Sequence, residues 1–247
     1  MGRLSGKTAV VTRGASGIGQ SFSRRLAQDG ANVAVADIKV AEETKRMVEG
    51  AGAKFVGVKC DVTKPQEIEA FAAEVKKSLG VAEILINNVG IFPLQAFEEM
   101  SFDDWRTINA INVEPLFLFS KAFVPGMKSV GYGRIVNMTS IVNWLKIDNY
   151  VHYITTKAAS IGFTRGLANE LGQFGITVNA IAPSLVRNAT TEASPLAGMF
   201  EAIPTMQAIP RLQVPDDLVG AMSFFVSEDA AFVTGQTLAV DGGLVKN

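Results

Sequence analysis

Residues 7–19 read KTAVVTRGASGIG, an apolar run that passes directly into a glycine-rich turn. The β-branched content predicts a strand over Thr8–Thr12, and the periodicity after the turn predicts a helix over Gln20–Gly30. Such a turn lets backbone N–H groups and a helix amino terminus approach a pyrophosphate. The segment therefore predicts the start of a dinucleotide-binding sheet. The turn residues expected to contact the cofactor are Gly14, Ser16, Gly17, Ile18 and Gly19.

The same alternation of strand and helix patterns continues along the chain. Further strands are predicted over Asn32–Asp37, Lys54–Lys59, Ile84–Asn87, Arg134–Thr139, Thr177–Ala182 and Thr237–Val240. Further helices are predicted over Pro65–Gly80, Phe102–Met127, Asn149–Gly172 and Pro215–Val226. This order predicts an α/β fold with a doubly wound, seven-stranded parallel sheet of the Rossmann type, in a single domain over 1–247. The piece around 184–214 has three prolines and no clear strand, so we expect it to cover the substrate at the sheet's carboxyl edge.

Composition excludes several classes of function. The formal net charge is −1, which argues against a nucleic-acid surface. The chain opens with polar MGRLSGK and has no apolar stretch long enough for a membrane span. One histidine and one cysteine, Cys60, cannot form a conventional metal site or an internal disulfide. We therefore expect a cytoplasmic enzyme that uses no metal, nucleic-acid or membrane partner.

Polar residues end the second, third and fourth predicted strands. Asp37 lies eighteen residues past Gly19, where a carboxylate can bond an adenosine ribose and repel a 2′-phosphate, which favours NAD. It could equally be a turn residue or a helix cap. Asp61 could contact adenine or cap the next helix. At the fourth strand's end, Asn88 and Gly90 would admit a ligand closely.

Tyr153 and Lys157 are four residues apart on a predicted helix and therefore share one face. A nearby cation lowers a tyrosine pKa from about 10, which suits proton exchange with a carbonyl or alcohol oxygen. Ser140 follows the strand GRIVNM at the sheet edge where ligands bind. A surface Tyr and Lys on one helix are common, so the pair acquires meaning only from this context.

With these residues assembled, the chain resembles the short-chain dehydrogenase/reductase family over essentially its full length. The motifs that carry the resemblance are Gly14-Ala-Ser-Gly17-Ile-Gly19, Asp61-Val62, Asn87-Asn88-Val89-Gly90, Asn112-Val113, Ser140, Tyr153-x-x-x-Lys157, Asn179-Ala180-Ile181-Ala182-Pro183 and Asp241-Gly242-Gly243. The resemblance implies NAD(H), a homotetramer and a catalytic set of Asn112, Ser140, Tyr153 and Lys157. It also implies cofactor contacts from Val62, Tyr153, Lys157, Pro183, Val186 and Asn188.

Within the family, segments 144–147, 182–187 and 190–194 look like those of members that interconvert aryl-alkyl ketones and secondary alcohols. The resemblance assigns proton transfer to Tyr153, orientation of the substrate oxygen to Ser140 and ribose binding to Lys157. Asn112 would hold a water that links Lys157 to solvent; a buried Asn satisfied by backbone is the alternative.

Arg13 is the main departure from the family pattern, because it stands where the first glycine of the turn is usual. Its side chain could crowd the adenosine, or it could favour NADP(H) by attracting a 2′-phosphate. We expect NAD(H), with NADP(H) possible because of Arg13. Val89 and Asn188 also replace the usual alanine and threonine.

Apolar residues are expected around the reacting carbon, which suits an aryl or alkyl ketone. They are Phe92, Pro93, Ile141, Trp144, Leu185, Met199 and Met206, although each could instead belong to the core. His152 adjoins Tyr153 but should point away from the catalytic face, since consecutive helical residues diverge by about 100°.

Two other functions stay open at this point. A 3-oxoacyl-carrier-protein reductase would use arginines near the mouth of the site to bind its acidic carrier, and Gly131 and Phe174 stand at the corresponding places here. A non-catalytic dinucleotide sensor would not need Ser140, Tyr153 and Lys157 together.

Overall fold

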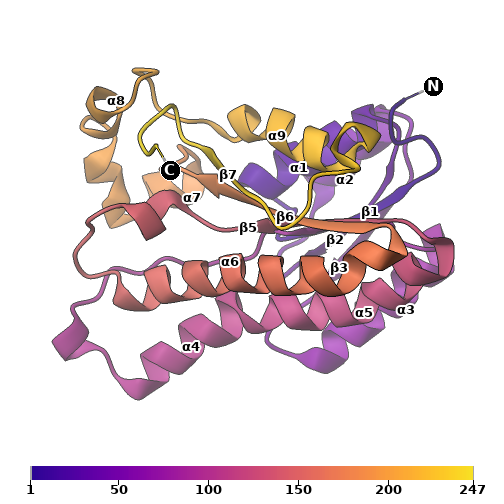
Figure 1. The fold of residues 1–247 in the computed structure, drawn as a ribbon, viewed down its shortest axis with the longest axis horizontal. Coiled ribbons are helices and arrows are strands. Elements are labelled where there is room, and N and C mark those ends of the chain that lie inside the picture. Colours follow the sequence, from indigo (N-terminus) through magenta and orange to yellow (C-terminus); the bar gives the residue numbers. More distant parts are fainter. Residues whose placement is uncertain (1, 247) are drawn as a thin grey trace.

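The computed structural model describes residues 2–246, which form a parallel sheet between two layers of helices (Figure 1). Its strands are β1 (Thr8–Thr12), β2 (Asn32–Asp37), β3 (Phe55–Lys59), β4 (Ile84–Asn87), β5 (Gly133–Met138), β6 (Ile176–Pro183) and β7 (Thr237–Val240). Their order is β3-β2-β1-β4-β5-β6-β7, and every neighbouring pair is parallel. The predicted doubly wound seven-stranded sheet is therefore confirmed.

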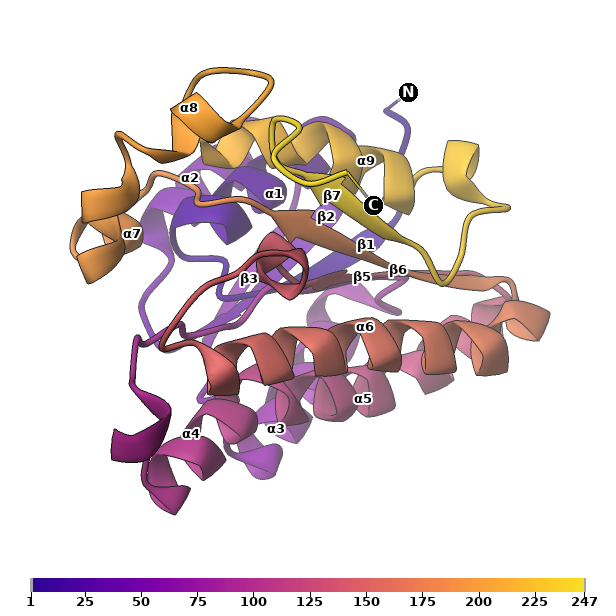
Figure 2. The same cartoon turned by 60° about the vertical axis from the view of Figure 1, so that its left-hand side comes forward.

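Helices cover both faces of the sheet, as parallel sheets require (Figure 2). On one face lie α1 (Gly17–Gln28), α2 (Glu42–Gly50) and α9 (Val219–Val226). On the other lie α3 (Pro65–Leu79), α4 (Phe102–Asn112), α5 (Glu114–Val130) and α6 (Val151–Leu171). Two short helices, α7 (Ala189–Glu192) and α8 (Ile203–Met206), stand apart from these layers.

The predicted strands agree with the observed ones to within a residue at each end, whereas one predicted helix was wrong and one observed helix was not predicted. The single helix expected over Phe102–Met127 is two helices that meet at Val113. Pro115 lies in the first turn of α5, where its missing N–H costs nothing, but it cannot continue a helix from α4. The nine-residue α2, rich in charged residues, was not predicted at all.

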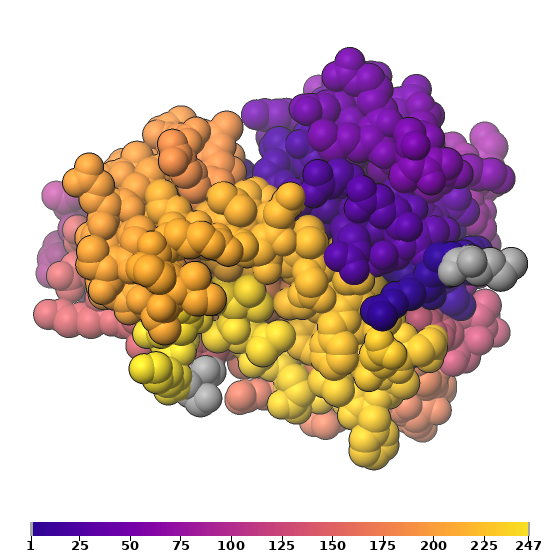
Figure 3. All heavy atoms as spheres, turned by 90° about the horizontal axis from the view of Figure 1, so that it is seen from above, coloured from indigo at the N-terminus to yellow at the C-terminus, as the bar shows by residue number. Residues whose placement is uncertain are grey.

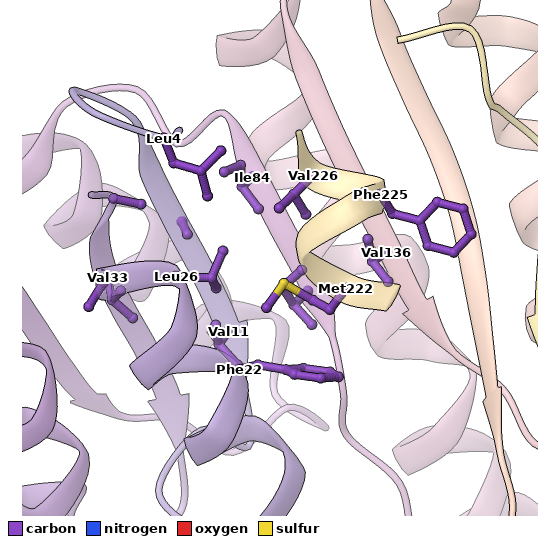
Figure 4. Packing of buried hydrophobic residues seen from close by; sticks show 14 of the residues in the cluster. Leu4, Val11, Phe22, Leu26, Val33, Ile84, Val136, Met222, Phe225 and Val226 are labelled. Atoms are coloured by element: carbon purple, nitrogen blue, oxygen red, sulfur yellow. The ribbon is translucent and has the colours of Figure 1, made fainter. Parts of the chain in front are cut away.

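Side chains on the two faces of the sheet pack into two separate hydrophobic cores. Val10 and Val11 are both fully buried, but they point to opposite faces because side chains alternate along a strand. On the α1 side, Val11 packs with Phe22 and Met222 (Figure 4). On the other side, Val10 shares a cluster with Phe71 and Phe119, whose rings meet edge to face at 6.1 Å.

The site lies where the strand order reverses. β1 pairs with β2 on one side and β4 on the other, so the chain leaves their carboxyl ends in opposite directions and opens a crevice there. The segment 184–214 contains α7 and α8 and forms one isolated bridge, Val186 to Gln213. It rises at one end of the α1–α9 face (Figure 3). Its role as a cover for the substrate remains a prediction.

Among residues 2–246, no helix is long and apolar enough to cross a membrane. The same residues contain no group of three or more His, Cys, Asp or Glu side chains placed to hold a metal ion.

Phe22→Ala tests the core on the α1 face. Phe22 is 0% exposed, so we expect the cavity to lower the free energy of unfolding by about 3–5 kcal/mol. Phe232 is fully exposed, and Phe232→Ala should change it by less than about 0.5 kcal/mol. Urea titration of both variants measures the difference. Equal losses would contradict the packing described here.

Candidate active site

One cavity opens at the carboxyl edge of the sheet and gathers residues that are far apart in sequence. The glycine turn contributes Arg13, Ser16, Gly17 and Ile18, and the loop after β4 contributes Asn88 and Gly90. The end of β5 and helix α6 bring Ser140, Tyr153 and Lys157 into the same space. Three of the four predicted catalytic residues and much of the predicted cofactor set therefore line one cavity.

Tyr153 lies at the centre of the catalytic end. The Ser140 side chain lies close enough to the Tyr153 hydroxyl to act on its pKa. The rings of Tyr150 and Phe92 pack beside the Tyr153 ring at centroid distances of 4.9 and 6.3 Å. Helix α6 sets this arrangement, because Tyr150 and Tyr153 are three residues apart and share a face. Tyr150 itself is held by its hydroxyl, which donates to the carbonyl of Phe92 at 3.2 Å.

The pKa of Tyr153 differs from the sequence expectation. Burial raises it to about 12, because the charged phenolate loses its hydration. The Ser140 side chain and the positive charge of Arg13 act in the opposite direction but do not prevail. The expected lowering by Lys157 is therefore not seen. At neutral pH the group is a phenol, which is the form that donates a proton.

Lys157 is 4% exposed, and its Nζ donates to the carbonyl of Met138 at 3.0 Å. Nζ lies 5.6 Å from the centroid of the Tyr153 ring. Burial, and then the nearby Arg13, lower the Lys157 pKa to about 8. The lysine can therefore lose its proton at a pH far below that of an exposed lysine.

Asn112 does not line the cavity but holds two of its walls together through hydrogen bonds. Its Oδ1 accepts from the backbone N–H of Ile91 at 2.8 Å, and its Nδ2 donates to the Ile91 carbonyl and to Thr156 Oγ1 at 2.9 and 3.1 Å. The side chain thus ties the loop after β4 to α6. A methyl group built on Gly90 would lie 3.2 Å from Lys157 Nζ and 3.7 Å from Asn112 Oδ1, so glycine keeps this space clear.

The other end of the cavity suits a phosphate group. Within the described chain, Ser16 precedes α1 without a side-chain capping bond, and the first turn of α1 has no acidic residue. Its amino-terminal N–H groups and the positive end of the helix dipole are thus available to an anion. A methyl group built on Gly17, at φ +58°, would meet only Asn188 Cγ, at 3.9 Å. These residues fit the diphosphate of a dinucleotide.

Several predicted cofactor residues hold the turn together instead of lining the cavity. Gly14 is packed so closely that a methyl group would lie 2.8 Å from Val35, and one on Gly19 would meet the backbone oxygen of Arg13. Asp37 Oδ2 accepts from the backbone N–H of Ala15 at 3.0 Å, which fastens the end of β2 to the turn.

Asp61 and Val62 lie outside the cavity residues. Asp61 Oδ1 accepts from the N–H and hydroxyl of Thr63, and these bonds lower its pKa. At the opposite wall, Pro183, Val186 and Asn188 do line the cavity. Asn188 Oδ1 caps α7 by accepting from the N–H groups of Thr190 and Thr191.

The apolar side of the cavity includes Phe92, Ile141, Leu185 and Met199 from the predicted pocket. Pro93, Trp144 and Met206 are not among its lining residues; Trp144 and Met206 are 37% and 58% exposed. Lining residues that were not predicted from the sequence are Leu94, Met138, Thr139, Val142, Leu145, Ile147, Tyr150, Ser184, Thr190, Thr191, Leu196, Ile203 and Leu244. Tyr150 could have been found from its i,i+3 spacing to Tyr153. His152 is 1% exposed and lies outside the cavity residues, as expected.

Known proteins share both sequence and fold with this chain. Residues 14–245 match a family model described as enoyl-(acyl carrier protein) reductase. The L-2,3-butanediol dehydrogenase of Corynebacterium glutamicum is 35% identical, over 98% of this chain and 99% of the relative. A 3-oxoacyl-[acyl-carrier-protein] reductase of Vibrio cholerae is 32% identical, over 98% of each. The carveol dehydrogenase of Mycobacterium avium, solved in complex with NAD, superposes with a TM-score of 0.91 at 26% identity, over 99% of each chain.

The chain belongs to the short-chain dehydrogenase/reductase family. It is an oxidoreductase of a family that binds NAD(P)(H). Within its cavity, Arg13 puts a cation in the glycine-rich turn beside the amino terminus of α1.

Lys157→Met tests the burial of Lys157. The lysine pKa falls from 10.5 to about 8 on folding, so the charged form costs stability below pH 8. Between pH 8 and 10.5 the native amine is neutral while the unfolded one still binds a proton. The loss of stability therefore shrinks steadily over this range and is gone above pH 10.5. At pH 7 we expect the free energy of unfolding of the variant to be roughly 2 to 3 kcal/mol higher than that of the parent.

This gain should shrink by pH 10, as measured by denaturant titration at both pH values. Lys54 is exposed, and Lys54→Met should show no such dependence. A gain that stays constant from pH 7 to 10 would mean that Lys157 is not desolvated.

Proposed function

We propose that this oxidoreductase interconverts a ketone and a secondary alcohol, with an aryl-alkyl ketone such as acetophenone as the favoured substrate type. The observation that carries the proposal is the cluster of Ser140, Tyr153 and Lys157 at one end of a cavity whose other end suits a diphosphate. The bound nicotinamide would supply or accept the hydride. Segments 144–147, 182–187 and 190–194 resemble those of (S)-1-phenylethanol dehydrogenases, which supports the substrate type.

The side chains divide the acid–base work. Tyr153, a phenol at neutral pH, donates its proton to the ketone oxygen as that oxygen gains negative charge. Ser140 bonds both this oxygen and the tyrosine hydroxyl, so it fixes their relative orientation. In the direction of alcohol oxidation, Tyr153 takes the proton back. Lys157 would bind a ribose hydroxyl of the cofactor, and Asn112 holds the Gly90 loop against α6.

The substrate class follows from the lining of the cavity. Phe92, Ile141, Leu185 and Met199 present apolar surface beside Tyr153 and Ser140, and the exposed lining is more apolar than polar. This apolar wall favours binding of a substrate that buries hydrocarbon against it. An aryl or alkyl group next to a single carbonyl fits this description.

We infer NAD(H) as the cofactor, with NADP(H) as the alternative. The buried Asp37 lies at the end of β2, where a carboxylate disfavours a 2′-phosphate. The NAD in the carveol dehydrogenase supports this preference by analogy. Arg13 acts against it, because its charge lies close enough to Asp37 to interact. We also propose a homotetramer, on the strength of the family resemblance alone.

Tyr153→Phe tests the proposal directly. We expect the parent to reduce acetophenone with NADH and the variant to lose at least about a hundredfold in kcat/KM, because the proton donor is gone. Tyr132 lies away from the cavity beside Lys7 and Arg134, so Tyr132→Phe should retain activity. Steady-state assays with NADH and NADPH measure both variants. Full activity in Tyr153→Phe would contradict the mechanism.

A second assay separates the oxoacyl reductase alternative, which the 32% identity to the Vibrio cholerae enzyme favours. A carrier-protein substrate would need cations near the mouth, whereas Gly131 and Phe174 stand at the expected places. We expect kcat/KM for an acetoacetyl thioester to be at least about tenfold below that for acetophenone. The reverse order would favour the reductase over the proposed ketone specificity.

A further inference from the structure

Arg13 occupies an unusual place in the cavity. Its backbone φ is +53°, and among residues 2–246 only Asn149 shares a positive φ without being glycine. Left-handed backbone costs an ordinary residue roughly 1–2 kcal/mol. Such strain persists only where the surroundings fix the conformation, and it concentrates at ligand sites.

The surroundings do fix it. The backbone N–H of Arg13 donates to the carbonyl of Ala36 at 2.7 Å, and Asn88 Nδ2 donates to the Arg13 carbonyl at 3.2 Å. Gly19 passes so close to that carbonyl that even a methyl group would not fit between them. The backbone therefore cannot rotate to carry the side chain elsewhere, and the side chain projects from this one orientation.

The guanidinium crosses to the opposite wall. Arg13 Nη1 donates to the carbonyl of Gly90, near the start of the loop that follows β4. Gly90 in turn borders Lys157, since a methyl group on it would lie 3.2 Å from Nζ. The Arg13 side chain thus spans from the glycine turn, beside the amino terminus of α1, to the catalytic end.

A bound dinucleotide would occupy the same space between the glycine turn and the catalytic end. If its diphosphate lies on the amino terminus of α1 and its reactive ring lies beside Tyr153, the atoms between them pass Asn88 and Gly90. The guanidinium on the Gly90 carbonyl fills that position. The backbone of the site fits the cofactor, whereas the Arg13 side chain conflicts with it.

We propose that Arg13 determines the affinity for the dinucleotide: its guanidinium lies across the cofactor crevice on the Gly90 carbonyl, and the cofactor binds only when this contact is broken. The inference rests on the proposed dinucleotide-dependent function. Asp37 carries the negative charge that acts on Arg13, so the displaced guanidinium would turn toward it. The apparent Kd then equals the intrinsic Kd divided by the fraction of molecules with the crevice open.

Arg13→Gly and Arg13→Asn test the inference. Both residues accept a positive φ, and neither reaches Gly90. We expect each to lower the Kd for NADH at least about tenfold, which corresponds to a crevice open in one molecule in ten or fewer. Titration of NADH fluorescence without any ketone measures this binding, and NADH-induced thermal stabilisation gives a second readout that does not depend on activity.

Two controls separate the contact from its side effects. Asn149→Gly removes the backbone strain at the other positive φ, at a residue that does not line the cavity. Arg165→Ala removes an exposed arginine from α6. Both should leave the Kd for NADH within about twofold of the parent. A Kd that falls equally in either control would assign the effect to strain or net charge and overturn the inference.

The remaining outcomes are distinct. An unchanged or higher Kd in both Arg13 variants would overturn the inference, because it would mean that Arg13 is neutral toward the cofactor or holds it. Turnover of acetophenone by the parent would in that case leave the proposed function intact. If neither the parent nor any variant binds NADH or NADPH, the proposed function falls, and the inference falls with it.

Discussion

The hydrogen bonds between the ends of β1 and β4 are the constraint on which the site depends. Thr12 Oγ1 accepts from the backbone N–H of Asn88 at 2.8 Å, and Asn88 Nδ2 donates back to the carbonyls of Thr12 and Arg13. These bonds hold the two strands together at the point where their following segments diverge. One wall of the crevice is thereby the glycine turn, and the other is the loop that leads through Gly90 to the catalytic residues.

Burial sets the chemistry at the far end of that crevice. Loss of hydration disfavours every charged form, so it raises the pKa of Tyr153 to about 12 and lowers that of Lys157 to about 8. In the proposed reaction, an anion that forms on the substrate oxygen would be stabilised by fixed groups, among them the hydroxyls of Ser140 and Tyr153. Such a site stabilises the charge of the transition state, because its dipoles are already oriented before the reaction.

The sequence predicted the parts of the fold that depend on local pattern. The strands are short, apolar and bounded by turns, so their bounds followed from the local sequence. The pairing of Tyr153 with Lys157 followed from helical spacing. The break at Val113 did not, because it depends on where α5 packs after Pro115. For Asp37 the sequence left a ribose contact and a turn role open, and only the structure shows that its carboxylate lies within reach of the N–H of Ala15. The sign of the Tyr153 pKa shift was likewise wrong, because spacing says nothing about the depth of burial.

Arg13 shows how a local departure can leave a fold intact and still alter its site. The turn keeps the left-handed backbone that glycine would adopt, because Ala36, Asn88 and Gly19 hold the main chain on three sides. These contacts hold the turn in its strained conformation, and the charge of Arg13 is offset by the Gly90 carbonyl and by Asp37. What changes is the space in front of the turn. A glycine leaves that space to a ligand, whereas an arginine fills it with a side chain that a ligand has to displace, so family membership settles the backbone of this site but not its affinity.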